Sequence, residues 1–397
     1  MKRNILVISN GRGEDSIAVT LLENLKKVLR QEELSEADLN IIALPLVGEG
    51  LLYKNTGYFT AATWNDLPSH GFFSVFSFLR DLRRGLLDNW RKQAEIIRRE
   101  AQTADLILTV GDIWPVLLVS LFGQRKKIVH MATAASIYIR RYSLAEIWLF
   151  KKYVSCVICR DLPTCTELQK FSVNAFYAGN PMLDDPILRS TNTNLGLDKK
   201  RRRIVLIPSS RADAYGNISR MLNVVKHFSV KNNFQFVISL APNLNLDRLR
   251  LALNKSDWSL FDLQHKKTPI AAELLSKNSA QVYVVHGYFR ECLNEASLVI
   301  GMTGTGNEQI AGLGIPLVLL KGKSAAASRG RLRHYKKLLD GAVFAPRGSD
   351  EKIARAVTEL LASSKKLQSM ADAGRARLGA AGGSHFIARK IWYYLYA

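Results

Sequence analysis

The chain has 397 residues, 47% of them hydrophobic, which is too many for one ordinary domain and enough for two buried cores. Its 56 Lys and Arg exceed its 34 Asp and Glu, and the net charge of +22 favours anionic partners. The sequence lacks an uncharged apolar run of about 18 residues, which argues against a transmembrane helix, and it lacks a nucleic-acid-binding motif.

The first part of the chain alternates apolar strands with helices. Strands are predicted at 4–9, 40–44, 105–110, 127–130 and 154–159. A helix is predicted at about 17–30, between the first two strands. Continuous apolar strands separated by helices are typical of a parallel sheet covered on both faces. The first strand follows directly on Met1 to Asn4 without a signal-peptide cleavage pattern, so we expect a cytoplasmic location.

A glycine-containing loop joins the first strand to the first helix. It includes Asn10, Gly11, Gly13 and Asp15, and Asp15 or Ser16 is expected to cap the helix. The two glycines indicate that the backbone approaches a ligand, although glycines in such loops also serve packing alone.

The segment from 70 to 90 combines aromatic and basic residues. A helix is predicted over about 73–101, and two readings of its first part stay open. It is an interfacial helix lying on anionic lipid, or an amphipathic helix packed on the sheet. The residues that favour the membrane surface are Phe72, Phe73, Phe76, Arg80, Arg83 and Arg84.

Two titratable residues follow or end buried strands. Asp112 comes directly after the strand at 106–110, and His130 ends the next strand. A side chain at the carboxyl end of a strand is placed to take a proton from a bound hydroxyl group. The alternatives are a helix N-cap for Asp112 and a buried, satisfied imidazole for His130.

The cysteines do not form a metal-binding pattern. Cys156 and Cys159 have CxxC spacing, but they lie in a predicted buried strand, and neither a second pair nor a histidine cluster completes a site. We expect buried, inert thiols, no metal and no cofactor.

A turn-rich stretch near residue 180 and a polar, basic stretch at 190–203 predict a linker. A second series of strands and helices follows, with helices at about 351–378 and 385–396. The predicted domains are therefore 1–185, 200–378 and a terminal helix in 379–397. The strands of the second series are expected at 203–208, 234–240, 282–285, 298–300 and 316–320.

The strand at 298–300 runs into the most informative loop of the chain. Gly301, Gly304 and Gly306 precede a short predicted helix that begins with Asn307 and Glu308. A glycine-rich loop before a helix offers free N–H groups and the positive end of the helix dipole to a phosphate. A carboxylate there would accept hydrogen bonds from a ribose, so the loop predicts a nucleotide site, with close packing of a plain βαβ unit as the alternative. The predicted contact residues are Thr303, Gly304, Thr305, Gly306, Asn307, Glu308 and Gln309.

Two further loops follow strands of the second series. Ser209 and Arg211 come after the strand at 203–208, and the guanidinium would bind a diphosphate. His286, Gly287 and Tyr288 come after the strand at 282–285. This loop is similar to the one whose backbone reads the nucleobase in GT-B glycosyltransferases. That resemblance implies that Gly287 permits a close approach to the base and that Tyr288 or Phe289 packs against it, with Phe289 in the core as the alternative.

The order of these motifs resembles that of GT-B glycosyltransferases and is most similar to the lipid-A-disaccharide synthase family, especially over 285–320. Two positions depart from the family's pattern. Ser209 stands where the family has glycine in a Pro-Gly-Ser-Arg run, and Asn180 replaces histidine in a Gly-His-Pro turn, which we therefore interpret as a hinge.

The resemblance implies an α/β protein of the GT-B fold, with two Rossmann-like domains whose parallel sheets face a central cleft. The N-terminal domain would bind a lipid or glycolipid acceptor, and the C-terminal domain a UDP-sugar. The implied activity is metal-independent, inverting transfer of a sugar to a lipid-linked acceptor by a protein peripherally attached to the cytoplasmic face of a membrane. Asp112, or alternatively His130, would deprotonate the acceptor, and Asn10, Gly11, Gly13 and Asp15 would line the acceptor side.

The sequence holds no Asp-x-Asp motif, through which metal-dependent transferases hold a diphosphate, so Arg211 and the loop N–H groups would stabilise the leaving group. Two other functions stay open. One is a UDP-sugar 2-epimerase, which shares the fold, and the other is a non-enzymatic membrane or polyanion binder on a degraded transferase fold.

Overall fold

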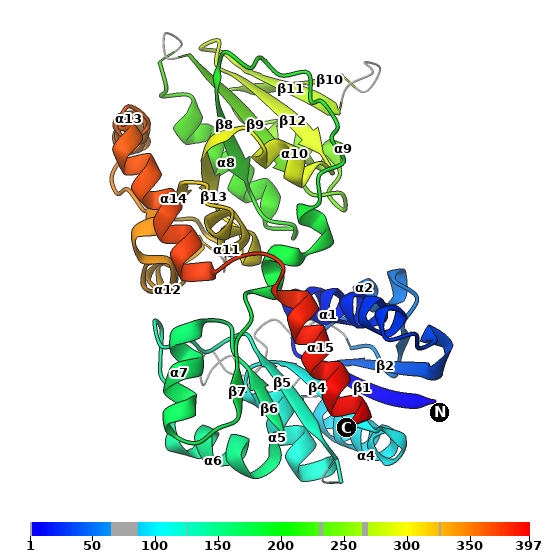
Figure 1. The fold of residues 1–397 in the computed structure, drawn as a ribbon. Coiled ribbons are helices and arrows are strands. Elements are labelled where there is room, and N and C mark those ends of the chain that lie inside the picture. The colour runs from blue at the N-terminus through cyan, green and yellow to red at the C-terminus, as the bar shows by residue number, and fades with distance from the viewer. Residues whose placement is uncertain (1, 65–85, 125, 230–232, 264–268, 325–326) are drawn as a thin grey trace. The chain divides into compact units, whose positions relative to one another are not determined.

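The computed structural model describes residues 2–64, 86–124, 126–229, 233–263, 269–324 and 327–397. These residues form two compact units (Figure 1). Unit 1 comprises residues 1–185 and 380–397, and unit 2 comprises residues 186–379. Within the described ranges, none of the helices combines the length and the apolar character needed to cross a membrane.

Unit 1 is built on a seven-stranded sheet, counted over its described residues, in which all the neighbouring strands are parallel. The strand order is β3-β2-β1-β4-β5-β6-β7. The strands are β1 (Arg3–Ser9), β2 (Leu39–Pro45), β3 (Phe59–Thr60), β4 (Leu106–Gly111), β5 (Ile128–Ala132), β6 (Cys156–Ile158) and β7 (Ala175–Phe176). The helices are α1 (Arg12–Gln31), α2 (Leu51–Asn55), α4 (Leu86–Thr103), α5 (Ile113–Phe122), α6 (Leu144–Tyr153), α7 (Leu162–Lys170) and α15 (Gly383–Tyr396).

The alternation of side chains along β1 divides the core of unit 1 into two layers. Ile5 and Val7 pack with α1 and α15 on one face of the sheet. Leu6 and Ile8 pack with α4 and α5 on the other. Both faces are covered because successive side chains of a strand point to opposite sides, which explains why the strands are apolar throughout.

The helix α15 is the last element of the chain and packs against α1 in unit 1 (Figure 1). Asp184 caps its start, since its carboxylate accepts hydrogen bonds from Gly382 N at 2.5 Å and Ser384 N at 2.8 Å. A Cβ atom on Gly383 would lie 2.4 Å from the carbonyl oxygen of Ala178. The turn at 179–181 therefore holds the beginning of α15 closely.

Unit 2 contains an eight-stranded sheet in its described residues, with the order β10-β11-β12-β9-β8-β13-β14-β15. The strands are β8 (Arg202–Ile207), β9 (Phe234–Leu240), β10 (Trp258–Asp262), β11 (Ile270–Ser276), β12 (Gln281–His286), β13 (Ala296–Gly301), β14 (Leu317–Leu319) and β15 (Val343–Phe344). The helices are α8 (Ala214–Val225), α9 (Leu246–Leu253), α10 (Phe289–Leu293), α11 (Thr305–Gly312), α12 (Arg329–Leu339), α13 (Asp350–Leu361) and α14 (Ser364–Leu378).

Two local predictions were wrong, and one pair of strands was missed. The strands β10 and β11 were not predicted, and they pair antiparallel with each other and with β12. The single helix expected over 351–378 is divided in two, because the side chain of Ser363 caps α14 by accepting from Lys366 N. The first helix begins at Arg12 with Gly11 as its N-cap, so neither Asp15 nor Ser16 is the cap.

In each sheet the strand order changes direction at the first strand of the unit. In unit 1 the first strand, β1, lies beside β4, and in unit 2 the corresponding pair is β8 and β13. Ligands of doubly wound sheets bind outside the carboxyl ends of the strands at such a switch point. The loops after β1, β4, β8 and β13 are therefore the places to look for a site.

Candidate active site

The loop between β13 and α11 lies at the switch point of unit 2. The helix α11 begins at Thr305, and Gly304 precedes it as an N-cap that contributes no side-chain hydrogen bond. In the described part of the chain, the N–H groups of Thr305 and Gly306 thus meet no capping side chain, while Asn307 N donates to Gly304 O at 3.1 Å. Glu308 is the fourth residue of the helix rather than its second, as predicted, and its side chain is largely buried.

Close contacts fix the path of this loop. The hydroxyl of Tyr335, on α12, donates to Gly304 O at 2.9 Å. The buried Asn307 donates from Nδ2 to Thr303 O at 2.7 Å. A Cβ atom on Gly301 would lie 2.3 Å from Asn307 Oδ1, so a glycine is required there for Asn307 to occupy its place.

The loop after β8 adjoins the glycine loop. Met302 N donates to Ile207 O at 2.9 Å, which joins the two strand ends. Ser209 has a φ of +119°, in the region that favours glycine. Its hydroxyl donates to Asp213 Oδ1 at 2.9 Å and accepts from Arg211 N at 3.2 Å. The serine thus occupies a backbone conformation suited to the glycine that stands here in the family that the sequence resembles.

The surroundings of this loop are strongly basic. Arg211 is exposed, and no ion pair joins its guanidinium to an acidic side chain in the described part of the chain. The helix α12, which carries Tyr335, has five basic residues, none of them paired with a described carboxylate. The five basic residues of α12 are Arg329, Arg331, Arg333, Lys336 and Lys337. An anion near the glycine loop would therefore experience a positive field.

The third predicted loop of unit 2 follows β12, which is separated from β8 by β9. His286 Nε2 lies 3.2 Å from Pro242 O. Gly287 has a φ of +86° and donates its N–H to Leu240 O at 2.9 Å. Tyr288 precedes α10 as its N-cap residue. The loop is on the same edge of the sheet as the glycine loop, three strands farther along.

At the switch point of unit 1, one hydrogen bond joins the loops after β1 and β4. Asn10 Nδ2 donates to Asp112 Oδ1 at 2.6 Å. Gly111 has a φ of +144°, and a Cβ atom there would lie 1.9 Å from Asn10 Oδ1. The glycine before the aspartate thus gives Asn10 its room.

Asp112 is the N-cap of α5, because its Oδ1 also accepts from Trp114 N at 2.8 Å. Burial raises the pKa of this carboxyl group, and the hydrogen bonds from Trp114 and Asn10 and the charge of Arg140 partly oppose the rise. Arg140 is held by two hydrogen bonds to Glu146, at 2.7 and 2.8 Å. A carboxylate with a raised pKa, at a strand end, is suited to general base catalysis.

Further polar groups lie along the same edge. Thr133 donates its N–H to Gly111 O at 2.9 Å and its hydroxyl to Glu14 Oε1 at 3.3 Å. The buried Arg160, which follows β6, donates to Thr133 O at 2.5 Å. A Cβ atom on Gly11 would meet the Glu14 carboxylate, while Gly13 lies in the first turn of α1.

Two predicted residues point into the interior. His130 is buried, and its Nδ1 lies 3.0 Å from Thr109 Oγ1. Burial lowers the pKa of His130 to about 3, so the ring is neutral. Asp15 is also buried and accepts a hydrogen bond from Ser9 Oγ at 2.6 Å. A side chain without exposed surface does not reach an acceptor, which leaves Asp112 as the stronger candidate base.

Several contributors were not identified from the sequence. Tyr335 and Arg140 are brought to their places by contacts between distant segments, and no local pattern marks them. Arg160 was detectable, because it follows a buried strand as Asp112 does. The predicted membrane residues Phe72, Phe73, Phe76, Arg80, Arg83 and Arg84 lie outside the described residues.

The four cysteines are free and buried. Within the described ranges, no group of three or more His, Cys, Asp and Glu residues could hold a metal ion.

Comparison with known proteins gives matches of structure only. No protein-family model and no curated protein sequence matches the chain. The solved structures that match include the calicheamicin glycosyltransferase CalG4, with a TM-score of 0.62 and 15% identity over 99% of this chain and 98% of that one. The S. aureus MnaA–UDP co-structure gives a TM-score of 0.60 and 14% identity over 99% and 97%. A UDP-N-acetylglucosamine 2-epimerase gives 0.57 and 13% over 100% and 98%.

These matches span nearly the whole length of both chains, and they agree with the two doubly wound sheets. The chain has the GT-B fold. The predicted fold class is confirmed. The resemblance to the lipid-A-disaccharide synthase family is supported only as far as the fold it shares with these glycosyltransferases and epimerases.

Proposed function

We propose that this GT-B protein is a glycosyltransferase that uses a UDP-sugar as its donor. The observation that carries the proposal is the uncapped start of α11 behind the glycine loop, at the switch point of unit 2. The N–H groups of Thr305 and Gly306 and the side chain of Arg211 would hold the diphosphate, and Glu308 would accept hydrogen bonds from the ribose. One solved structure of the same fold is the MnaA–UDP complex, and another is a UDP-N-acetylglucosamine 2-epimerase.

In the proposed reaction, Asp112 accepts the proton of an acceptor hydroxyl group. The hydroxyl oxygen bonds to the anomeric carbon of the sugar, the bond from that carbon to the phosphate oxygen breaks, and UDP leaves with the electron pair. Asn10 and the backbone of Trp114 hold the carboxylate in place for this step. Positive groups around the glycine loop stabilise the departing diphosphate without a metal ion.

We further propose a lipid-linked acceptor and peripheral attachment to the cytoplasmic face of a membrane. The net charge of +22 favours an anionic surface. The resemblance to the lipid-A-disaccharide synthase family points in the same direction, whereas the altered positions Ser209 and Asn180 argue against claiming that family's own acceptor.

Calorimetry with UDP, in the presence of EDTA, tests the donor site. We expect the wild-type protein to bind UDP and Glu308→Ala to bind it about tenfold or more weakly, because the ribose would lose a charged acceptor. Glu359→Ala, on α13, is the matched control for removal of one acidic residue. Absence of UDP binding by the wild type would overturn the proposal.

The fold of the epimerase neighbour favours a second candidate, a UDP-sugar 2-epimerase. That reaction would need further acidic residues and a histidine around the sugar, and no acceptor. Incubation with UDP-N-acetylglucosamine alone separates the two functions, because only the epimerase would change the free sugar nucleotide.

A further inference from the structure

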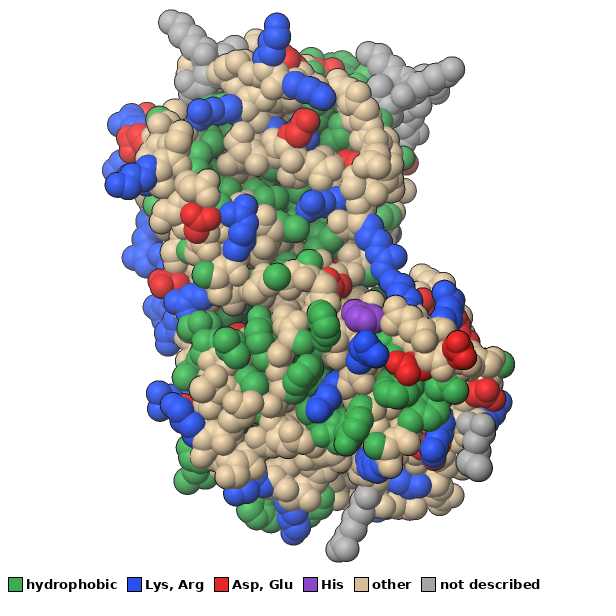
Figure 2. All heavy atoms as spheres, viewed as in Figure 1, with side chains coloured by type: hydrophobic (Ala, Val, Ile, Leu, Met, Phe, Trp, Pro, Cys, Tyr) green, Lys and Arg blue, Asp and Glu red, His purple; other side chains and the backbone are tan. Residues whose placement is uncertain are grey.

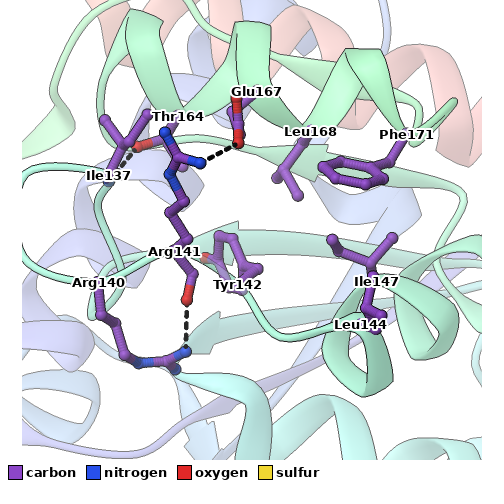
Figure 3. Close-up of a pocket in the computed structure, with 10 residues that line it drawn as sticks. All are labelled: Ile137, Arg140, Arg141, Tyr142, Leu144, Ile147, Thr164, Glu167, Leu168 and Phe171. Atoms are coloured by element: carbon purple, nitrogen blue, oxygen red, sulfur yellow. Dashed lines mark hydrogen bonds and ion pairs between the residues drawn. The ribbon is translucent and has the colours of Figure 1, made fainter.

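A hollow in unit 1 lies between α6 and α7, apart from the loops of the candidate active site. Its cavity volume is about 110 Å³. An apolar cavity of about 150 Å³ takes up benzene, so a hollow of this size has room for a short alkyl segment. Figure 3 shows that Leu144 and Ile147 line it from α6, and Leu168 and Phe171 from the opposite side. The lining is apolar where the two helices face each other.

The mouth of the hollow is unusually apolar for a surface. Leu144 lines the hollow and is 75% exposed, and Phe171 is 40% exposed. Trp148 lies one turn beyond Leu144 on the same face of α6 and is 56% exposed. Grouped exposed apolar side chains of this size mark a binding surface. Figure 2 shows that hydrophobic side chains gather on unit 1 with Lys and Arg side chains among them.

Cations surround this apolar group. Arg141 and Lys170 share one acid, Glu167, at 3.6 Å each. Lys151 and Lys152 end α6, and Lys152 Nζ lies 4.7 Å from the centre of the Trp148 ring. The cations exceed the acids around the mouth, so its charge is complementary to anionic head groups.

We propose that this α6–α7 surface inserts into the head-group region of an anionic lipid bilayer and takes a segment of one acyl chain into the hollow. The surface consists of Leu144, Trp148, Phe171, Arg141, Lys151, Lys152 and Lys170. Tryptophan prefers the membrane interface, and long basic side chains reach the head groups while their stems stay on the apolar part.

The inference deepens the proposed function and rests on it where it concerns the acceptor. Arg140 lines the hollow and acts electrostatically on Asp112. A lipid held at the hollow would consequently be bound by the unit that carries the candidate base.

Sedimentation with vesicles tests the surface directly. Vesicles of phosphatidylglycerol and phosphatidylcholine are compared with vesicles of phosphatidylcholine alone. The double variant Leu144→Gln/Trp148→Gln is expected to bind the anionic vesicles at least tenfold more weakly, because two large apolar side chains no longer insert. Leu251→Gln/Phe261→Gln, exposed by 68% and 50% in unit 2, is the matched control and should bind as the wild type does.

A charge variant separates the two parts of the surface. Lys151→Gln/Lys152→Gln should lose about 25-fold in affinity for the anionic vesicles, about fivefold for each cation, and little for the neutral ones. Acyl chains brominated near the head group should quench the fluorescence of the wild type more than that of Trp148→Phe.

The proposal is overturned if the wild-type protein does not bind anionic vesicles, or if the Leu144/Trp148 variant binds them as well as its control. UDP calorimetry on the same variants distinguishes this failure from failure of the transferase. UDP binding with no effect of the variants on vesicles refutes the surface alone, and vesicle binding as expected without UDP binding refutes the donor site alone.

Discussion

The helices α5 and α11 begin at equivalent places in the two units and treat their first N–H groups in opposite ways. Each follows the strand beside the first strand of its sheet, at the switch point. In unit 1, Asp112 caps α5 with its own carboxylate. In unit 2, Gly304 leaves the start of α11 without a capping side chain.

The same position in the two units thus yields two kinds of site. A capped start fixes a carboxylate at the edge of the sheet and leaves little attraction for an outside anion. An uncapped start keeps the positive end of the helix dipole available to a ligand. Small residues make both arrangements possible, since Gly111 gives room to Asn10 and Gly301 gives room to Asn307.

Replacing the capping carboxylate should have the largest effect. Asp112→Asn retains a side-chain oxygen that can cap α5, but it lacks a base. We expect the turnover of UDP-sugar with a lipid extract to fall about 10²- to 10⁴-fold, with UDP binding unchanged. Equal loss of UDP binding would show that the residue serves the fold rather than the reaction.

The pH dependence of the same turnover sharpens this result. Activity needs ionised Asp112, whose pKa burial raises above the ordinary aspartate range, so activity should fall on the acid side at a higher pH than for an exposed aspartate. Asn10→Ala removes a hydrogen bond that lowers this pKa and should move the acid limb to still higher pH.

Giving α11 a capping carboxylate should convert the open start into a closed one. Gly304→Asp places a negative charge where the phosphate is proposed to bind, so UDP affinity should fall on the order of 10- to 100-fold in calorimetry. Gly304→Ala measures the effect of any side chain at this position, where a Cβ atom meets nothing within 4 Å. Equal losses in the two variants would disprove the electrostatic explanation.

The buried His130 should make unit 1 less stable at acid pH. The pKa of His130 is about 3 in the folded protein and ordinarily 6.5, so below pH 6.5 the unfolded state binds a proton that the folded state does not. Stability from this group is present above pH 6.5 and should fall by about 2 kcal/mol at pH 5. Urea unfolding at pH 7.5 and 5.0 should show a pH difference about 2 kcal/mol smaller in His130→Gln than in the wild type, and equal differences would contradict the assignment.

The smallest effect is expected at Ser209, the strained residue in the loop that adjoins the glycine loop. Both Ser209→Ala and Ser209→Gly lose the hydroxyl bonds, but only glycine accepts a φ of +119° without strain. The glycine variant should therefore be about 1 kcal/mol more stable than the alanine variant in urea unfolding. An alanine variant of equal or greater stability would show that the serine is not strained.

The α/β class could be predicted because the central strands are continuous apolar runs, which follow from burial on both faces of a sheet. The pair β10 and β11 was missed because it is more polar. Ser259, Phe261 and Asp262 are exposed and β11 carries Glu273, so neither strand reads as a buried run. A helix boundary was also missed where a single residue marks it, as with Ser363, which caps α14.

For the candidate site, the sequence identified the loops but not the contacts within them. The glycine loop has a local pattern, and strand ends are recognisable one by one. The bond between Asn10 and Asp112 joins segments about one hundred residues apart, and the support of Gly304 by Tyr335 joins a loop to a different helix. Such pairs depend on strand order, which a single sequence does not reveal.

The return of α15 to unit 1 bears on how the protein is made. Ile387, Ile391 and Leu395 belong to the same buried cluster as α1. Asp184 caps α15, which follows it by about two hundred residues. During synthesis, unit 2 emerges complete while unit 1 still exposes the apolar face of α1. Although its first strand is made first, unit 1 is expected to finish folding last. A chain that ends before residue 380 would contain a complete unit 2 and an incomplete unit 1 that exposes an aggregation-prone apolar surface.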